Sequence, residues 1–243
     1  MSYLLELHNI SKSFGALTAL RNLSFHIGEG EVVGLLGDNG AGKSTTVNLI
    51  SGIHKPTDGH LSVDGKRALF TCRSDSADAG IETIYQHTAL VDSLSITRNI
   101  FMGRELTDRF GFLRQAEMRA IAMEVLQNAV HISGIDSPDT LVGNLSGGQK
   151  QAVAIARAVY FKKRVLLLDE PTSALSVRET EALLNQVLKL KAENVSSVLV
   201  THNIYHAYQV CDRFVIMSHG TKVFDVAKAD TTISQLTDYV VLT

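Results

Sequence analysis

The sequence predicts an α/β fold in which a mostly parallel sheet forms the core, antiparallel strands come first, and a helical subdomain is inserted. The first observation is a set of unbroken apolar runs, typical of strands that are covered on both faces. These runs are EVVGLL (31–36), RVLLLD (164–169), SVLVT (197–201) and RFVIMS (213–218). The second is an alternation near the N-terminus, where Leu23, Phe25 and Ile27 share one face, as in a half-buried antiparallel strand.

The third observation is a helical period between the first two apolar runs. In AEMRAIAMEVLQNAV (116–130), apolar side chains recur at the spacing of one helical stripe. The stripe consists of Met118, Ile121, Val125 and Ala129. This segment therefore predicts an amphipathic helix that packs against a neighbour.

These patterns predict a single domain, 1–243, built in two parts. Residues 1–87 and 164–243 are expected to form the α/β core, and residues 88–163 a mainly helical insertion. Late in the chain, HGTKVF (219–224) predicts a hairpin turn.

Composition excludes several classes of protein. The 243 residues are 45% hydrophobic and 20% charged with a formal net charge of −2, which argues against binding to nucleic acid or lipid through bulk charge. Cys72 and Cys211 are isolated thiols, so a disulfide framework or zinc site is not expected. The first ten residues lack the pattern of a signal peptide, and no apolar run approaches the ~20 residues of a membrane helix.

A glycine-rich loop follows the run at 31–36. GDNGAGKST (37–45) satisfies G-x-x-x-x-G-K-[ST] between a predicted strand and a predicted helix. Gly40 and Gly42 allow the backbone to curl so that successive N–H groups point at phosphate oxygens. Lys43 is expected to reach the β- and γ-phosphates, and the Ser44 hydroxyl to bind Mg²⁺.

Two acidic residues end the run RVLLLDEP (164–171). Asp169 lies where a carboxylate can hold Mg²⁺ through its water shell, and Glu170 points elsewhere, placed to orient or deprotonate an attacking water. Taken alone, this pattern also fits a strand with a polar end. Together with the loop at 37–45 it predicts hydrolysis of a nucleoside triphosphate.

A second anion-binding pattern lies about a hundred residues after the phosphate loop. NLSGGQKQ (144–151) places Ser146, Gly147 and Gly148 at the start of a helix, where bare backbone N–H groups suit an anion. The chain already has a phosphate loop, so this second site raises the question of which phosphate it serves.

The motifs together resemble the ATP-binding cassette (ABC) family, the nucleotide-binding subunits of ABC transporters, over essentially the full chain. The matching pieces, in family order, are GDNGAGKST (Walker A), the glutamine of IYQHTAL (Q-loop), LSGGQKQ (signature), VLLLDEP (Walker B) and THN (H-loop). LSGGQ between the two Walker motifs is highly specific. The resemblance implies a P-loop NTPase of RecA-like fold that binds ATP and Mg²⁺.

The resemblance also implies roles for single residues. The catalytic set would be Glu170, His202 and Gln86, and the metal ligands Ser44, Gln86 and Asp169. Phe14 would stack on adenine, although a core phenylalanine is the alternative. The ATP-binding residues would be Phe14, Gly37, Asn39, Gly40, Ala41, Gly42, Lys43, Ser44 and Thr45 and, in the signature, Ser146, Gly147, Gly148 and Gln149. In the family two cassettes pair head-to-tail, so the signature would face the γ-phosphate held by a neighbour.

The chain departs from the family pattern after Walker B. The usual SALD reads SALS, with Ser176 in place of aspartate. Ser176-x-x-Glu179 forms a capping box pattern before a predicted helix, so the local role as an N-cap is expected to survive. A charge that in the family helps communication across the dimer is missing at this position.

Within the family, one cassette without membrane helices resembles bacterial importers, and GDNGAGKSTTVNLISG and YQHTALVDSLSITRNIFMGRE resemble subunits of ribose- and fructose-type importers. The resemblance implies an ATP-dependent homodimer at the cytoplasmic face of the inner membrane. It further implies a separate permease, an external solute-binding protein and no nucleic acid partner. Three alternatives remain: a cassette for another solute such as an amino acid or lipid, a soluble non-transport ABC ATPase, and a non-hydrolysing dimerisation switch.

The same resemblance predicts a permease groove near Gln86 and residues 88–135. Apolar side chains that could line it also fit the core of the helical subdomain. They are Leu90, Leu94, Ile96, Ile100 and Phe101.

Overall fold

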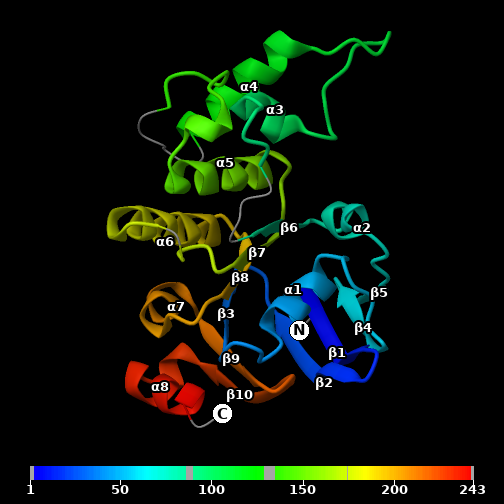
Figure 1. The fold of residues 1–243 in the computed structure, drawn as a ribbon, viewed down its shortest axis with the longest axis vertical. Coiled ribbons are helices and arrows are strands. Elements are labelled where there is room, and N and C mark those ends of the chain that lie inside the picture. Colours follow the sequence, from blue (N-terminus) through cyan, green and yellow to red (C-terminus); the bar gives the residue numbers. More distant parts are fainter. Residues whose placement is uncertain (1–2, 86–89, 129–134, 174, 242–243) are drawn as a thin grey trace. The chain divides into compact units, whose positions relative to one another are not determined.

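The computed structural model describes residues 3–85, 90–128, 135–173 and 175–241 (Figure 1). The chain divides into two compact units. The first comprises Met1–Tyr85, Lys163–Pro171 and Leu184–Thr243, and the second comprises Gln86–Lys162 and Thr172–Leu183. Helix α6 (Val177–Ala192) belongs to the second unit at its start and to the first unit at its end.

The first unit contains a small antiparallel sheet with the strand order β2-β1-β4-β5. Its strands are β1 (Leu5–Phe14), β2 (Leu17–Ile27), β4 (Asp58–Val63) and β5 (Lys66–Ala68). The alternation expected in β2 is present, because Leu23, Phe25 and Ile27 are buried and the intervening side chains are partly exposed. One face of this sheet therefore faces the core.

The larger sheet of the first unit has the order β10-β9-β3-β8-β7-β6. Its strands are β3 (Val32–Leu36), β6 (Ile81–Ile84), β7 (Val165–Asp169), β8 (Ser196–Val200), β9 (Arg213–Ser218) and β10 (Thr221–Ala227). All neighbours pair in parallel except β10, which returns antiparallel to β9. The return turn contains His219 and Gly220, both with positive φ, as the predicted hairpin requires.

One hydrophobic cluster joins both sheets of the first unit. Inward-facing residues of the antiparallel sheet pack with those of the larger sheet and with Val47, Leu49 and Ile50 of helix α1 (Lys43–Ile50). The other helices here are α2 (Arg73–Asp78), α7 (Ile204–Val210), the 3-10 turn η2 (Lys228–Asp230) and α8 (Ile233–Val241). The four apolar runs of the sequence thus form β3, β7, β8 and β9, as predicted.

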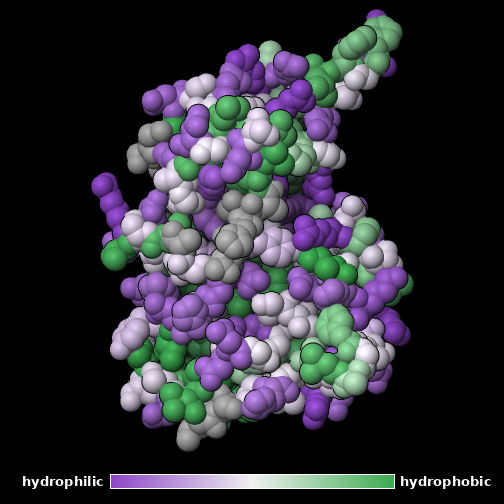
Figure 2. All heavy atoms as spheres, in the orientation of Figure 1, coloured by the Kyte–Doolittle hydropathy of each residue, from purple (hydrophilic) through white to green (hydrophobic). Residues whose placement is uncertain are grey.

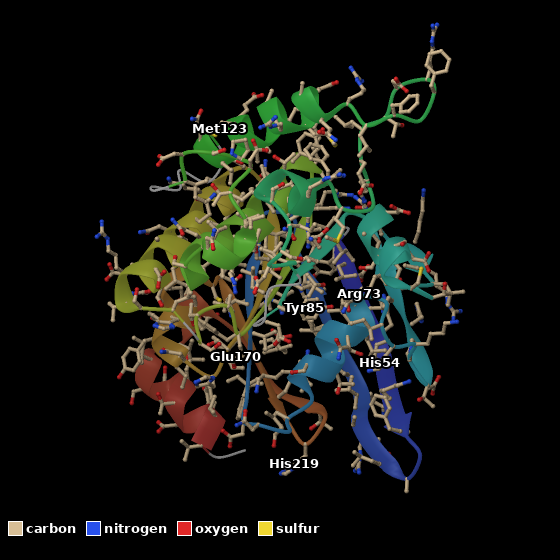
Figure 3. All side chains as sticks on the ribbon, turned by 45° about the horizontal axis from the view of Figure 1, so that its top comes forward. His54, Arg73, Tyr85, Met123, Glu170 and His219 are labelled. Carbon is tan, nitrogen blue, oxygen red and sulfur yellow. The ribbon has the colours of Figure 1, made fainter. Side chains whose placement is uncertain are left out.

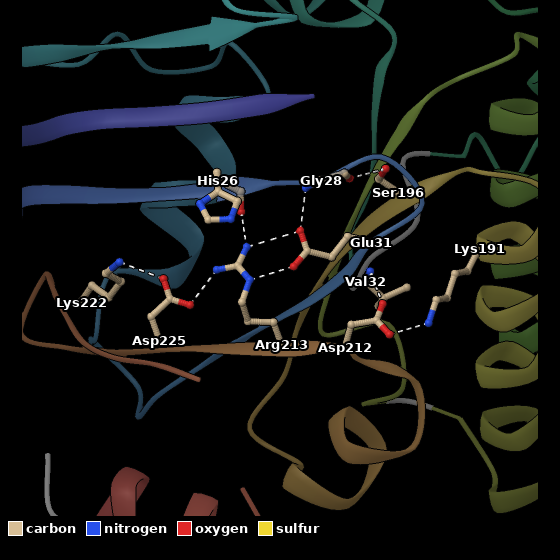
Figure 4. Close-up of polar contacts among 10 residues, drawn as sticks. All are labelled: His26, Gly28, Glu31, Val32, Lys191, Ser196, Asp212, Arg213, Lys222 and Asp225. Atoms are coloured by element: carbon tan, nitrogen blue, oxygen red, sulfur yellow. Dashed lines mark hydrogen bonds and ion pairs between the residues drawn. The ribbon is translucent and has the colours of Figure 1, made fainter. Parts of the chain in front are cut away.

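An ionic network ties the antiparallel sheet to the larger one (Figure 4). Arg213, at the start of β9, donates from Nε to Glu31 Oε1 at 2.7 Å and from Nη1 to Asp225 Oδ1 at 2.7 Å. Its Nη2 donates to the carbonyl oxygen of His26 in β2 at 2.5 Å. The Arg213 side chain is only 12% exposed, so this guanidinium is largely removed from water. It links β2, β9 and β10 with the residue that precedes β3.

The second unit is helical around its own core. Its helices are α3 (Ile96–Phe101), α4 (Gln115–Asn128), the 3-10 turn η1 (Val142–Asn144), α5 (Gly147–Tyr160) and the beginning of α6. On α4 the fully buried stripe is Met118, Ala122 and Leu126, while Ile121 and Val125 are only partly buried. The buried stripe is therefore rotated by one residue from the predicted one, and Ala129 lies outside the described residues.

The apolar residues considered for a permease groove contribute to this core. Ile96, Ile100 and Phe101 are fully buried, and the Phe101 ring lies edge-on to those of Tyr160 and Phe161. Leu90 and Leu94 are partly buried. The core interpretation is thus the correct one for the α3 residues, because they are fully buried and α3 packs against α4 and α5.

A short segment between α3 and α4 exposes aromatic side chains. Thr107 bridges to Leu113, and the turn between them leaves Phe110 and Phe112 70% and 72% exposed. Figure 2 shows apolar side chains on this projecting segment. Within the described residues, no helix is both long and apolar enough to cross a membrane.

Replacing Arg213 by alanine is expected to lower the free energy of unfolding by about 3 kcal/mol, because the carboxylates of Glu31 and Asp225 would stay partly buried without their shared cation. Chemical denaturation measures the loss. The matched control is Arg164→Ala, which removes an ion pair with Asp64 whose side chains are 44% and 50% exposed. That change is expected to cost about 1 kcal/mol or less. Equal losses in the two variants would contradict the assigned role of Arg213.

Candidate functional site

The phosphate loop lies between β3 and α1, as its sequence predicts. Gly37, Gly40 and Gly42 have φ values of 141°, 88° and 103°, which L-residues rarely adopt. Gly42 is the N-cap of α1, and its carbonyl accepts the backbone N–H of Thr46 at 2.9 Å. The loop is thus a curled backbone that ends at a helix N-terminus, a geometry that suits an anion. Of the other loop residues, Ala41 is buried, Thr45 is partly buried, and Asn39 and Ser44 are exposed.

Lys43 is folded back against this loop. Lys43 is only 7% exposed, and its Nζ donates to the carbonyl oxygens of Gly37 at 2.6 Å and Asp38 at 2.9 Å. Burial lowers the pKa of Lys43, and the carboxylates of Glu170, Asp38 and Asp169 act in the opposite direction. The buried ammonium is therefore held by loop carbonyls and by the field of nearby acids.

Strand register brings the acids to the same edge. Leu35 of β3 pairs with Val200 of β8, and Val200 pairs with Asp169 of β7, so the three strands end in one row. Burial raises the pKa of Asp169, and the charge of Glu170 raises it further, while Lys43 lowers it. A half-buried carboxylate thus faces the lysine of the phosphate loop at the carboxyl end of the sheet.

Glu170 turns sharply out of the strand. Its φ of 47° lies in the left-handed region, and its backbone N–H donates to the Val200 carbonyl at 2.9 Å. A residue other than glycine in this conformation costs about 1–3 kcal/mol, and such strain concentrates at functional sites. Figure 3 labels Glu170 at this turn, and the expectation that its side chain points away from that of Asp169 stays a prediction.

His202 contacts Glu170 directly. The backbone N–H of His202 donates to Glu170 Oε1 at 3.1 Å, and its ring Nδ1 lies 2.9 Å from the same oxygen. Asn203 then caps α7, accepting the backbone N–H of His206 at 3.2 Å, which fixes the chain just after His202. We call Lys43, Asp169, Glu170 and His202 the strand-end cluster. The sequence predicts these four residues but does not reveal that His202 pairs with Glu170.

Phe14 lies at the end of β1 and is 43% exposed, so the alternative of a core phenylalanine is wrong. Its ring meets His54 edge-on at a centroid distance of 5.1 Å, and Lys12 Nζ lies 4.9 Å from its centroid. An exposed face beside a cation is available to a planar ligand, but the role in adenine stacking stays a prediction.

Gln86 lies outside the described residues. The residue before it, Tyr85, is described, and the guanidinium of Arg73 lies over its ring at 5.0 Å from the centroid (Figure 3). Arg73 belongs to helix α2, so this contact holds Tyr85, the residue that precedes the Q-loop glutamine, against α2. The assignment of Gln86 as a catalytic and metal-binding residue stays a prediction.

The signature segment (145–149) belongs to the second unit and starts helix α5. Ser146 is the N-cap: its Oγ accepts the backbone N–H of Gln149 at 3.3 Å, and the Gln149 side chain accepts the N–H of Ser146 at 2.9 Å. Gly147 is exposed, and Gly148 is partly exposed. The predicted helix start is therefore present, but the Gly148 N–H is not bare, because it donates to Glu179 Oε1 at 3.2 Å.

The capping box at Ser176 is also present. Glu179 Oε2 accepts the backbone N–H of Ser176 at 3.0 Å and its hydroxyl at 2.8 Å, and Ser176 Oγ accepts the N–H of Glu179 at 3.4 Å. These bonds, with others from Ser146 and Gly148, lower the pKa of Glu179 to about 2. Sequence analysis finds the capping box but misses the contact of Glu179 with the signature segment, which depends on tertiary packing.

Comparisons with known proteins agree with this geometry. A family model described as ABC transporter matches residues 20–173, and one described as P-loop domain matches residues 114–243. The chain is 45% identical to the xylose/arabinose import ATP-binding protein XylG of Sulfolobus acidocaldarius over 98% of this chain and 94% of that protein. It is 36% identical to the fructose import ATP-binding protein FrcA of Rhizobium meliloti over 95% and 91%.

Other relatives are longer or have known structures. Identity to the ribose import ATP-binding protein RbsA of Hahella chejuensis is 37% over 99% of this chain, which spans 48% of that protein. A dimeric ATP-binding cassette in a post-hydrolysis state with ADP and Pi is 28% identical, with a TM-score of 0.77 over 92% of this chain and 98% of that one. The ADP conformation of an ABC transporter cassette is 23% identical, with a TM-score of 0.83 over 100% and 98%, and shows the shared fold.

Gly42→Ala is expected to destabilise the protein more than Gly40→Ala. Both changes force a side chain into positive φ, which costs about 1 kcal/mol or more. A Cβ at Gly42 would also lie 2.7 Å from Leu20 Cδ2 and 3.1 Å from the Ala19 carbonyl, whereas a Cβ at Gly40 would meet nothing within 4 Å. Chemical denaturation of the two variants makes the comparison. An equal loss, or a larger loss for Gly40→Ala, would contradict the packing described for the loop.

Proposed function

The chain belongs to the ABC transporter family as the ATP-binding subunit of a sugar importer, and from this premise we propose that the strand-end cluster hydrolyses the ATP. The observation that carries the proposal is the convergence of Lys43, Asp169, Glu170 and His202 at the carboxyl ends of three adjacent parallel strands. Three of them have the chemistry that phosphoryl transfer needs: Lys43 is a cation for phosphate, Asp169 a carboxylate for a metal and Glu170 a base for water. The fourth, His202, contacts Glu170.

In this proposal the phosphate loop binds the nucleotide. The backbone of Gly37–Thr45 provides N–H groups, and Lys43 moves its ammonium from the carbonyls of Gly37 and Asp38 to the phosphates. A lysine already buried and surrounded by acids gains an anionic partner without further loss of water. Phe14 supplies an exposed ring face for adenine.

The residues near Asp169 fit Mg²⁺. Mg²⁺ prefers oxygen ligands and is typically bound through one or two carboxylates together with the substrate phosphates. Ser44 offers an exposed hydroxyl at the first turn of α1, and Asp169 a half-buried carboxylate with a raised pKa that a cation would lower. We propose these two residues, with Gln86, as the metal-binding set. When bound, the ion would offset charge on the phosphates.

Glu170 is proposed as the general base. Its carboxylate holds one oxygen, Oε1, against the backbone and ring of His202. This contact fixes the direction of the carboxylate, so that a water bound to it would be oriented toward the phosphate. His202 is thus proposed to position Glu170 and, through its exposed ring, to contact the γ-phosphate.

The signature segment is the second predicted anion site, and the question is which phosphate it binds. We propose that a second copy of this chain brings its ATP to Ser146 and Gly148, so that the nucleotide lies between two cassettes. The dimeric cassette that is 28% identical supports this proposal. A ligand that contacts the paired form at additional points shifts the equilibrium toward pairing, and hydrolysis removes that contact.

The wider assembly follows from the importer relatives. We propose a separate permease chain, an external solute-binding protein and attachment to the cytoplasmic face of the membrane through the permease. The xylose/arabinose and fructose import proteins support a monosaccharide as the solute. The cassette itself binds ATP, so the sugar need not touch it.

Glu170→Gln is expected to lower the ATPase rate at least a hundredfold, the typical contribution of a general base, while leaving the affinity for ATP nearly unchanged. The amide keeps the size of the carboxylate but cannot accept a proton. Steady-state phosphate release and equilibrium binding of a fluorescent ATP analogue separate the two quantities. Glu193→Gln, which neutralises an exposed glutamate just after α6, serves as the control. Full activity of Glu170→Gln would refute the assigned role.

A further inference from the structure

Glu179 already contacts the groups that the proposed function assigns to phosphate. Its Oε1 accepts the backbone N–H of Gly148 at 3.2 Å, and the Ser146 side chain also bonds to this carboxylate. Its other oxygen, Oε2, accepts the N–H and hydroxyl of Ser176. All four residues belong to the second unit, so one carboxylate bridges the starts of α5 and α6.

The fit at Gly148 is close. A Cβ at this glycine would lie 2.8 Å from Glu179 Cγ and 2.9 Å from Oε1. These separations are shorter than van der Waals contact, so a side chain at 148 would clash with Glu179. The glycine therefore allows the carboxylate to reach the backbone N–H. The carboxylate is thus seated on the same glycine surface that would have to receive a phosphate.

Donor counting makes the two anions mutually exclusive. The Gly148 N–H and the Ser146 hydroxyl each carry a single hydrogen, and each can make only one strong hydrogen bond at a time. With a pKa of about 2, Glu179 is ionised at neutral pH, so an arriving phosphate meets both an occupied donor and a like charge.

We propose that Glu179 acts as an internal competitor of the partner's ATP at the signature segment, holding Ser146 and Gly148 until a phosphate displaces it. The inference rests on the proposed function, because it requires that a second cassette brings ATP to this segment. The two oxygens of Glu179 bond to different residues, which suits displacement. Oε1 can leave Gly148 while Oε2 keeps its bonds to Ser176. Helix α6 therefore stays capped in both states.

The competitor also gives a role to the unusual Ser176. Where the family usually has an aspartate, this chain has a serine whose hydroxyl donates to Glu179, and a carboxylate at 176 would instead repel it. The negative charge of Glu179, three residues further along, reaches the signature segment. Two cassettes then pair only when a phosphate binds the signature segment strongly enough to displace the Glu179 carboxylate.

The test compares Glu170→Gln with the double variant Glu170→Gln/Glu179→Gln. Hydrolysis is blocked in both, and glutamine at 179 keeps the capping box without the charge. Light scattering measures the concentration of Mg-ATP that gives half-maximal pairing. The double variant is expected to need about tenfold less ATP, within the usual range of coupling between two sites. Glu170→Gln/Glu181→Gln, which neutralises an exposed glutamate of the same helix, controls for net charge.

A second readout follows the contact itself. In nucleotide-free protein, the Gly148 amide is expected to exchange its hydrogen several-fold faster in Glu179→Gln than in the unchanged chain, because a neutral amide accepts more weakly than a carboxylate. The same or a higher ATP requirement for the double variant overturns the competition. If the Glu170→Gln parent does not pair at any ATP concentration, both this inference and the proposed pairing fail, whereas pairing that is insensitive to residue 179 refutes the competitor alone.

Discussion

The parallel pairing of β3, β8 and β7 is the constraint on which the site depends. It aligns Leu35, Val200 and Asp169 in one row, so that the segments following the three strands all begin at the same edge of the sheet. Lys43, Glu170 and His202 come from those segments, and none of them would meet without that register. A slip by one residue would reverse the side chains of a strand and separate the acids from the lysine.

The two helix starts proposed to bind phosphate differ in the charged side chain that lies against them. At the start of α1 the phosphate loop is accompanied by a buried cation, Lys43, which bonds to loop carbonyls. At the start of α5 the signature segment is accompanied by a carboxylate, Glu179. A buried cation suits the binding of a phosphate, and we propose that the carboxylate opposes it until the phosphate of a second cassette displaces it. In this proposal the difference makes the pairing of two cassettes sensitive to the bound nucleotide.

Local sequence predicts the parts of this site but not the contacts between them. GDNGAGKST is readable because spacing and flanking elements fix its backbone, and the positive φ values of Gly40 and Gly42 follow from it. The contacts of Glu170 with His202 and of Glu179 with Gly148 join residues about thirty positions apart, so strand register and helix packing decide them. The exposure of Phe14 likewise could not be predicted from the sequence, because an apolar residue at a strand end fits either a core or an exposed site.

We propose that the signature segment binds the ATP of a second copy of this chain. Light scattering on the purified Glu170→Gln variant, with saturating Mg-ATP and then with Mg-ADP, tests this pairing. We expect a dimer with ATP and a monomer with ADP, because in the proposed pair only the triphosphate would reach Ser146 and Gly148 of the partner cassette. A monomer in both nucleotides, with ATP binding confirmed, would contradict it.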